Sequence, residues 1–323
     1  MKQEEDVSQR RKVDRSRLLP ELARMLDAAD MVDAKPVEAQ TPEEARASSE
    51  IRIRGQWGNK DDLETIETFH IPSAGANIQV RLYRTTGAAD TILYFHGGGW
   101  VVGSLETHDG PLRALTLATG ANILSVEYRK APEAPFPASL DDAEAALAWL
   151  DMHATEKALD GDKLIVMGDS AGASIAAALC VRARNRGRPL FGQVLVYPAT
   201  DLAHGTESRE TFAYGYSISR STLDWFARQY MSGGVPATNP ELSPLLMDDL
   251  AGLPPTLLVT ADHDPLRDEG RAYAQKLIGA GNDVTYVEWR GTVHGFMMMD
   301  RFTPAARQLI GQVAEWCKRR WMG

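Results

Sequence analysis

The chain of 323 residues is 44% hydrophobic and 24% charged, and its formal net charge at pH 7 is −9. This composition is typical of a globular protein with a large core, and the length suits one α/β domain with an elaboration. Binding to nucleic acid or to an anionic membrane requires clustered Lys and Arg side chains that displace counterions. The acidic balance therefore argues against both as partners.

Two further features bear on where the protein acts. The N-terminal segment is charged throughout and no stretch of about 18 apolar residues occurs, so we expect neither secretion nor a membrane span. The only cysteines, Cys180 and Cys317, lie in no Cys-x-x-Cys or His-rich context. We expect free thiols in a reducing cytoplasm and no metal ion.

Residues 1–50 are polar and have helical periodicity. Leu18, Leu22 and Leu26 recur at helical spacing, and Thr41 and Glu44 form the pattern of a capping box that opens a second helix. The segment has an apolar stripe but no strand of its own to pack against. We expect it to form the N-terminal part of a helical cap.

From residue 63 onward the pattern changes to short apolar runs separated by helical patterns. Buried runs that alternate with helices predict an α/β protein with a mainly parallel, doubly wound sheet flanked by helices. The expected strands are 63–71, 77–83, 91–95, 122–128, 163–167, 193–197, 255–260 and 283–289, and the clearest helical patterns are 139–153, 171–186, 268–280 and 304–319.

One interval, 201–254, is too long for a single helix between two strands. We assign approximately residues 201–240 to the second part of the cap. The α/β core is then expected to comprise residues 51–200 and 241–323.

The sequence Gly168-Asp169-Ser170-Ala171-Gly172 follows an expected strand and opens a helix rich in small residues. A nucleophile elbow requires this context, because the serine occupies a strained turn between strand and helix whose neighbours approach closely. A plain turn would also produce a G-x-S-x-G pattern, but its position between strand and helix favours Ser170 as a nucleophile.

A second motif, His96-Gly97-Gly98-Gly99, follows the strand expected at 91–95. Consecutive glycines allow backbone N–H groups to face an approaching carbonyl oxygen, as in half of an oxyanion hole. The alternatives are a flexible turn and a phosphate-binding loop. No Gly-Lys-Ser/Thr follows, and no G-x-G-x-x-G occurs, which argues against a nucleotide site.

Asp264 and His294 each follow an expected strand. The resulting chain order Ser, Asp, His is the order of catalytic residues in folds that have a nucleophile elbow. Spacing alone leaves other acids open, namely Asp262, Asp268 and Glu269. His263 is a rival for His294, but it precedes the acid and shares its loop, so it is poorly placed to reach the serine.

Together these motifs resemble the bacterial hormone-sensitive-lipase-like esterases of the GDSAG group, within the α/β-hydrolase superfamily. The resemblance extends from about residue 41 to the C-terminus. It is carried by HGGGW at 96–100, EYRKAPEAPFPA at 127–138, GDSAG at 168–172, DPLRDEG at 264–270 and HGF at 294–296.

The resemblance implies an α/β-hydrolase fold with a cap, Ser170 as nucleophile, Asp264 as the acid and His294 as the base. It also implies an oxyanion hole formed by the N–H groups of Gly98, Gly99 and Ala171. Aromatic side chains that are candidates to line the substrate pocket are Trp100, Phe212, Tyr214, Tyr216 and Trp225.

We therefore expect a serine carboxylesterase that hydrolyses short- to medium-chain acyl esters through an acyl-enzyme, without cofactor or metal. The alternatives are an amidase or arylacetamide-deacetylase-like hydrolase, a lactonase and, more remotely, a non-catalytic ligand-binding protein on the same scaffold. The last strand, 284–289, is a candidate edge for a homodimer.

Overall fold

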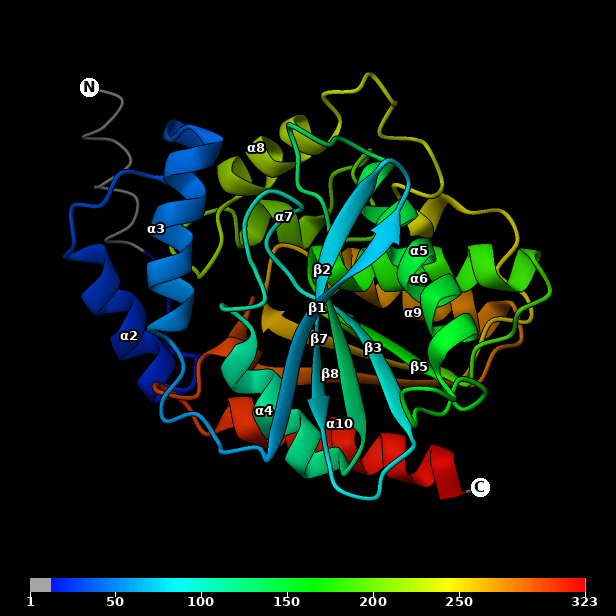
Figure 1. Cartoon of the computed structure of the whole chain (residues 1–323). Coiled ribbons are helices and arrows are strands. Elements are labelled where there is room, and N and C mark those ends of the chain that lie inside the picture. The colour runs from blue at the N-terminus through cyan, green and yellow to red at the C-terminus, as the bar shows by residue number, and fades with distance from the viewer. Residues whose placement is uncertain (1–12, 323) are drawn as a thin grey trace.

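A computed structural model describes residues 13–322, and its centre is a sheet of eight strands in the order β1-β2-β4-β3-β5-β6-β7-β8 (Figure 1). The strands β1 and β2 form an antiparallel hairpin, β2 pairs antiparallel with β4, and every other pairing is parallel. The strands are Thr65–Ser73, Ala76–Arg84, Thr91–Phe95, Asn122–Glu127, Ile165–Asp169, Gly192–Val196, Thr256–His263 and Val284–Val293. The expected mainly parallel sheet is confirmed.

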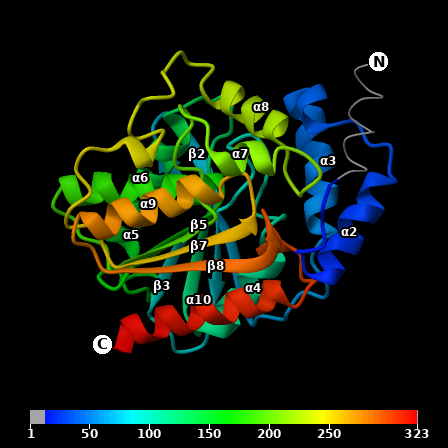
Figure 2. The same ribbon diagram turned by 180° about the vertical axis from the view of Figure 1, so that it is seen from behind.

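Helices cover both faces of this sheet. The helices α4 (Asp109–Thr119) and α10 (Ala305–Met322) pack together on one face, while α5 (Ala138–His153), α6 (Ala171–Asn185) and α9 (Arg267–Gly279) lie on the other (Figure 2). Every residue of β3, β5 and β6 is consequently buried. Burial from both sides explains why these strands are unbroken apolar runs rather than alternating ones.

The helix α4 is absent from the clear helical patterns of the sequence. Most of its residues are buried, among them Leu112, Leu115, Thr116 and Thr119. At 11 residues α4 is the shortest of the helices that cover the sheet, and a short apolar segment is hard to distinguish from a strand in the sequence.

The expected cap segments form short helices beside the sheet. The first contains α2 (Pro20–Asp30), the turn η1 (Val37–Ala39) and α3 (Pro42–Arg54), and Thr41 and Glu44 form the predicted capping box. Its first twelve residues lie outside the described part of the chain. The second contains α7 (Glu207–Thr211) and α8 (Arg220–Tyr230).

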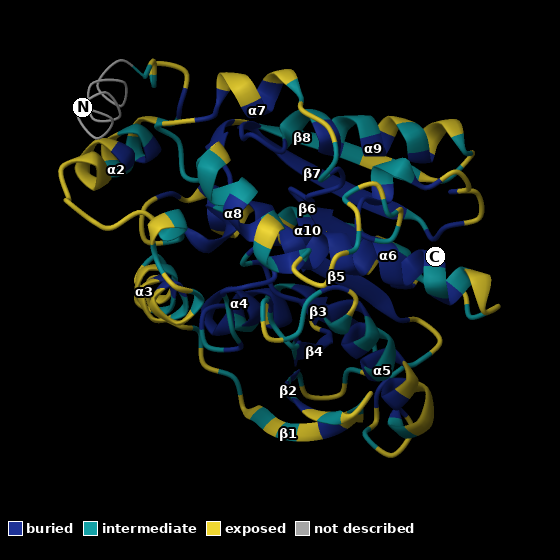
Figure 3. Ribbon diagram, turned by 90° about the horizontal axis from the view of Figure 1, so that it is seen from above, coloured by how far each residue is buried: buried dark blue, intermediate teal, exposed yellow. Residues whose placement is uncertain are grey.

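Hydrogen bonds join these two segments, although nearly 200 residues separate them. Glu38 accepts the hydroxyl groups of Ser221 at 2.6 Å and Thr222 at 2.8 Å, and Arg15 donates to the carbonyl oxygen of Gly215 at 3.0 Å. Figure 3 shows that buried residues concentrate in the central strands and α6, whereas the outer sides of α2, α3 and β1 are exposed. The two remaining short turns are η2 (Pro244–Leu246) and η3 (Phe296–Met298).

Within the described residues, none of the helices combines the length and the apolar character that crossing a membrane requires. Cys180 on α6 and Cys317 on α10 are both buried and form no disulfide.

Candidate active site

Ser170 lies in the sharp turn between β5 and α6, as its motif predicts. Its φ of 53° is a left-handed conformation that non-glycine residues rarely adopt, and this strain holds the side chain at the end of the sheet. The neighbouring glycines leave the space that the turn needs. A Cβ atom on Gly172 would lie 2.0 Å from the carbonyl oxygen of Phe95, and one on Gly168 would lie 2.3 Å from the backbone of Gly172.

A chain of two hydrogen bonds joins Ser170 to His294 and Asp264. The Nε2 atom of His294 lies 2.9 Å from the Oγ of Ser170, and its Nδ1 atom lies 2.7 Å from a carboxylate oxygen of Asp264. Asp264 immediately follows β7 and His294 immediately follows β8, because both strands run further than the sequence indicated. The three side chains thus meet at the carboxyl edge of the parallel sheet.

This arrangement sets the protonation of the imidazole. The carboxylate of Asp264 accepts a hydrogen bond from the Nδ1–H group, which leaves Nε2 with a lone pair for the hydroxyl of Ser170. Burial disfavours the charged imidazole, but the adjacent Asp264 carboxylate outweighs burial and raises the pKa of His294 above its ordinary value. The site therefore favours the transfer of a proton from serine to histidine.

The glycine-rich loop lies beside Ser170 with backbone donors available. Gly98 and Gly99 have φ values of 127° and 58°, which L side chains adopt poorly. Among residues 13–322, the N–H groups of Gly98, Gly99 and Ala171 have no hydrogen-bond acceptor. Gly99 and Ala171 also line the pocket at Ser170. Two of these three residues thus border the same pocket as Ser170.

His96, the first residue of this loop, has a supporting position. Its Nδ1 lies 2.8 Å from the carbonyl oxygen of Gly97, its ring stacks on Tyr128 with centroids 4.3 Å apart, and the Tyr128 hydroxyl donates to its carbonyl oxygen. Burial lowers the pKa of His96 to about 4. His96 is consequently neutral at pH 7 and orders the loop.

The other acidic candidates have different partners. Asp262 bonds to His263 at 2.7 Å, Asp268 accepts a backbone N–H from α7 at 2.8 Å, and Glu269 accepts the Nε–H of Arg209 at 2.9 Å. None of these carboxylates bonds to His294. The structure thus places Asp264, among the four acids left open, beside the imidazole.

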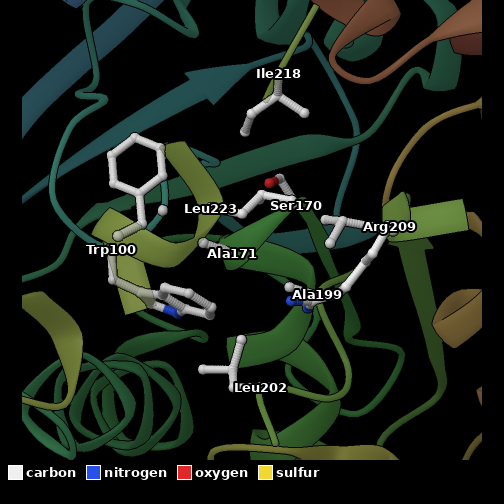
Figure 4. Close-up of a pocket in the computed structure, with 11 residues that line it drawn as sticks. Trp100, Ser170, Ala171, Ala199, Leu202, Arg209, Ile218 and Leu223 are labelled. Atoms are coloured by element: carbon white, nitrogen blue, oxygen red, sulfur yellow. The ribbon is translucent and has the colours of Figure 1, made fainter. Parts of the chain in front are cut away.

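A narrow pocket opens beside Ser170 (Figure 4). Its cavity volume is about 20 Å³. One water molecule needs about 10 to 15 Å³, so the cavity holds one or two water molecules. Only two of its side chains, Ser170 and Arg209, end in strongly polar groups. The lining residues are Gly99, Trp100, Ser170, Ala171, Ala199, Leu202, Arg209, Ile218, Leu223, Phe226 and Leu266.

Of the five aromatic candidates, the structure places only Trp100 in this lining. Trp225 is buried and its ring packs against that of Phe226, Phe212 and Tyr216 pack near His263, and Tyr214 is 45% exposed. The neighbour of Trp225, Phe226, lines the pocket instead. Successive helical residues point about 100° apart, so an error of one position moves a side chain off the pocket.

Sequence reasoning did not identify Arg209, Ile218, Leu223 or Leu266 as lining residues. The first three lie in the interval 201–240, which is expected to belong to the cap. The unusual length of this interval is the sequence feature that could have indicated lining residues there. No group of three or more His, Cys, Asp or Glu side chains within residues 13–322 has the arrangement of a metal site.

Comparison with known families gives a match over residues 92–298 to a family described by its alpha/beta hydrolase fold. This span includes Ser170, Asp264, His294 and the glycine-rich loop. The chain belongs to this α/β-hydrolase family. The resemblance that the motifs indicated is thereby confirmed, together with the fold.

Several named relatives of this α/β-hydrolase are ester hydrolases. It is 40% identical over 242 residues to the carboxylic ester hydrolase LipN of Mycobacterium tuberculosis, covering 72% of this chain and 64% of LipN. It is 36% identical over 269 residues to an ethyl acetate hydrolase of Pseudomonas putida, covering 80% of this chain and 84% of that enzyme. The crystal structure of a mutant of LAE6, an alpha/beta hydrolase enzyme from the metagenome of Lake Arreo, Spain, is 36% identical, covers 95% of this chain and 100% of its own, and has a TM-score of 0.92.

In this α/β-hydrolase the buried Asp169 connects the nucleophile turn to the glycine-rich loop. Its carboxylate accepts the N–H of Gly97 at 2.8 Å and the hydroxyl of Tyr94 at 2.7 Å, and the Nε2 of His108 lies 3.1 Å away. Burial opposes the charge, but His108 and the hydrogen bonds outweigh it and lower the pKa of Asp169. An ionised side chain thus ties the loop to the residue that precedes Ser170.

Proposed function

We propose that this α/β-hydrolase is a serine carboxylesterase that hydrolyses short- to medium-chain acyl esters through an acyl-enzyme. The observation that carries the proposal is the hydrogen-bonded chain from Ser170 through His294 to Asp264. It is joined by the backbone N–H groups of Gly98, Gly99 and Ala171, which have no acceptor within residues 13–322. The names of the relatives, which include a carboxylic ester hydrolase and an ethyl acetate hydrolase, support the same class of substrate.

In the proposed reaction, His294 takes the proton of Ser170 as the serine oxygen attacks the ester carbonyl. Asp264 holds the imidazole in the required tautomer and stabilises its charged form. The alcohol then leaves with the proton from His294. A water molecule, activated by the same histidine, attacks the acyl-enzyme and releases the carboxylic acid.

Both tetrahedral intermediates carry a negative oxygen. The N–H groups of Gly98, Gly99 and Ala171 are proposed to donate to it, and each such donor typically contributes about 3 kcal/mol of transition-state stabilisation. Because the donors belong to backbone held by Asp169 and by the start of α6, they need little rearrangement during the reaction.

The helices of segments 13–50 and 201–240 are proposed to act as the cap over this site. Ile218, Leu223 and Phe226 from the second segment contribute an apolar wall. The hydrogen bonds from Ser221 and Thr222 of this segment to Glu38 in η1 connect it to the first segment. The narrow cavity supports the preference for short to medium acyl chains, because long chains would need a larger displacement of this wall.

The direct test is the initial rate of hydrolysis of p-nitrophenyl esters from acetate to palmitate. Wild type is expected to favour the shorter esters, and Ser170→Ala is expected to lower turnover by roughly 10⁴ to 10⁶. The exposed Ser232→Ala on the surface after α8 serves as the matched control and is expected to retain wild-type rates. An active wild type that turns over anilides or lactones but no acyclic ester would contradict the proposed substrate class.

We also infer a cytoplasmic location and a homodimer. The first is supported by two buried cysteines without a disulfide, which suits a reducing compartment. The second is supported by β8, whose outer edge pairs with no strand of the described chain. A light-scattering mass near that of one 35.5 kDa chain would exclude the dimer.

A further inference from the structure

Arg209 on α7 is the one charged side chain among the pocket-lining residues. Its side chain is 11% exposed and enters the lining from the side opposite to Trp100 in Figure 4. The rest of the lining is almost entirely apolar, apart from Ser170 itself. A buried cation in an apolar pocket is costly unless its donors are satisfied, so the partners of Arg209 are informative.

Two of the three guanidinium nitrogens are bound within the protein. The Nε–H donates to Glu269 at 2.9 Å, and Nη2 lies 2.8 Å from the same carboxylate and donates to the carbonyl oxygen of Asp201 at 2.8 Å. Glu269 is fully buried and also accepts the backbone N–H of Thr200 at 2.8 Å. The planar guanidinium is therefore held in one orientation.

The third nitrogen, Nη1, has no acceptor in the part of the chain that the structure describes. Burial alone would lower the pKa of Arg209, but Glu269 outweighs it and raises the pKa, so the group remains a cation. A charged donor held at the wall of a substrate pocket discriminates between ligands. A bound oxygen accepts its hydrogen bond, whereas a bound hydrocarbon displaces water and leaves the donor unpaired.

We propose that Arg209 makes this esterase selective for esters whose pocket-bound substituent carries a neutral acceptor oxygen, such as an ether or ketone, in place of a methylene. The inference rests on the proposed esterase function and specifies its substrate class. A neutral oxygen fits better than a carboxylate, because Glu269 already balances the charge of Arg209 and a second anion would remain uncompensated in this apolar site.

The competing explanation is purely structural: Arg209 only neutralises the buried Glu269. The two explanations differ in what they predict for a ratio of rates. Loss of a structural counterion lowers the hydrolysis of all esters alike. Loss of a recognition donor lowers the hydrolysis of oxygen-bearing esters more than that of their hydrocarbon counterparts.

The test uses two isosteric substrate pairs, one for each side of the scissile bond. They are p-nitrophenyl 4-methoxybutanoate against the hexanoate, and 2-methoxyethyl acetate against butyl acetate. For each pair the ratio of kcat/KM, oxygen over methylene, is compared between enzymes, so that the intrinsic reactivities of the esters cancel. The variants are Arg209→Met combined with Glu269→Gln, which avoids an unpaired buried carboxylate, and Arg209→Lys, which keeps the positive charge but has one ammonium nitrogen in place of the three guanidinium nitrogens. Glu269→Gln alone, which keeps the guanidinium, is the control.

We expect the ratio to fall by about tenfold to a hundredfold in both Arg209 variants for at least one pair, which is the effect of losing one hydrogen bond from a charged donor. The control is expected to keep the wild-type ratio. Equal losses for both members of each pair would overturn the proposal. An Arg209-dependent preference for p-nitrophenyl hemisuccinate over the methoxybutanoate would overturn the neutral-oxygen assignment. A wild type inactive on every ester would instead refute the esterase function itself.

Discussion

The carboxylate of Asp169 accepts the backbone N–H of Gly97 at 2.8 Å, across 72 residues of sequence. This hydrogen bond joins the turn that carries Ser170 to the loop that carries two of the proposed oxyanion donors. The nucleophile and the N–H donors that stabilise the tetrahedral intermediate must keep a fixed separation, because a displacement of about 1 Å weakens catalysis strongly.

Asp169→Ala removes the acceptor for Gly97 and for the buried hydroxyl of Tyr94. We expect kcat for a p-nitrophenyl ester to fall by roughly 10- to 100-fold with a smaller change in KM, because the loop serves the transition state. Unfolding in urea should show a loss of about 2 to 4 kcal/mol. Asp169→Asn, which keeps one acceptor oxygen, is expected to recover part of kcat; an unchanged kcat in Asp169→Ala would refute the positioning role.

The raised pKa of His294 has a consequence for the pH dependence of hydrolysis. The histidine must be neutral to accept the proton of Ser170, so the rate falls as the pH drops through its pKa. Because Asp264 raises that pKa, the acidic limb of kcat/KM is expected above the ordinary histidine value of about 6.5. A pH–rate profile measured from 5 to 9 checks this, and a flat profile down to pH 5 would contradict histidine as the base.

Asp264→Asn is expected to lower kcat by roughly 10⁴, because an amide favours the wrong imidazole tautomer. The matched control is Asp262→Asn, which removes a nearby buried carboxylate that bonds to His263 instead. The control should retain kcat to within a few-fold. Steady-state kinetics on both variants decide the acid, and a reversed order of the two losses would assign that role to Asp262.

Gly172→Ala is expected to abolish soluble, folded protein. The added methyl group would lie 2.0 Å from the carbonyl oxygen of Phe95, between α6 and β3, where no backbone can yield cheaply. Gly311→Ala in α10 is the control, because a Cβ there meets nothing within 4 Å. It should stabilise the protein by about 0.5 to 1 kcal/mol. Thermal unfolding of both variants measures the contrast.

The positions of Ser170, Asp264 and His294 could be predicted because the carboxyl ends of parallel strands converge, so residues just after three strands meet in space. The choice of Asp264 over Asp262 could not be made from spacing, since two residues on one turn differ only in direction. The sequence likewise did not show which side chains line the pocket. Trp225 and Phe226 are adjacent aromatics, and only the rotation of α8 decides that Phe226, and not Trp225, lines the pocket. The position of Arg209 could not be predicted because its partner, Glu269, is 60 residues away in the sequence.

Labelling of the protein with a fluorophosphonate, followed by peptide mass spectrometry to locate the adduct, shows whether Ser170 is the activated nucleophile. We expect one label per wild-type chain on Ser170, much slower labelling of His294→Ala and none of Ser170→Ala. A hydrolytically active wild type that carries its label on another residue, or that stays unlabelled, would contradict this assignment.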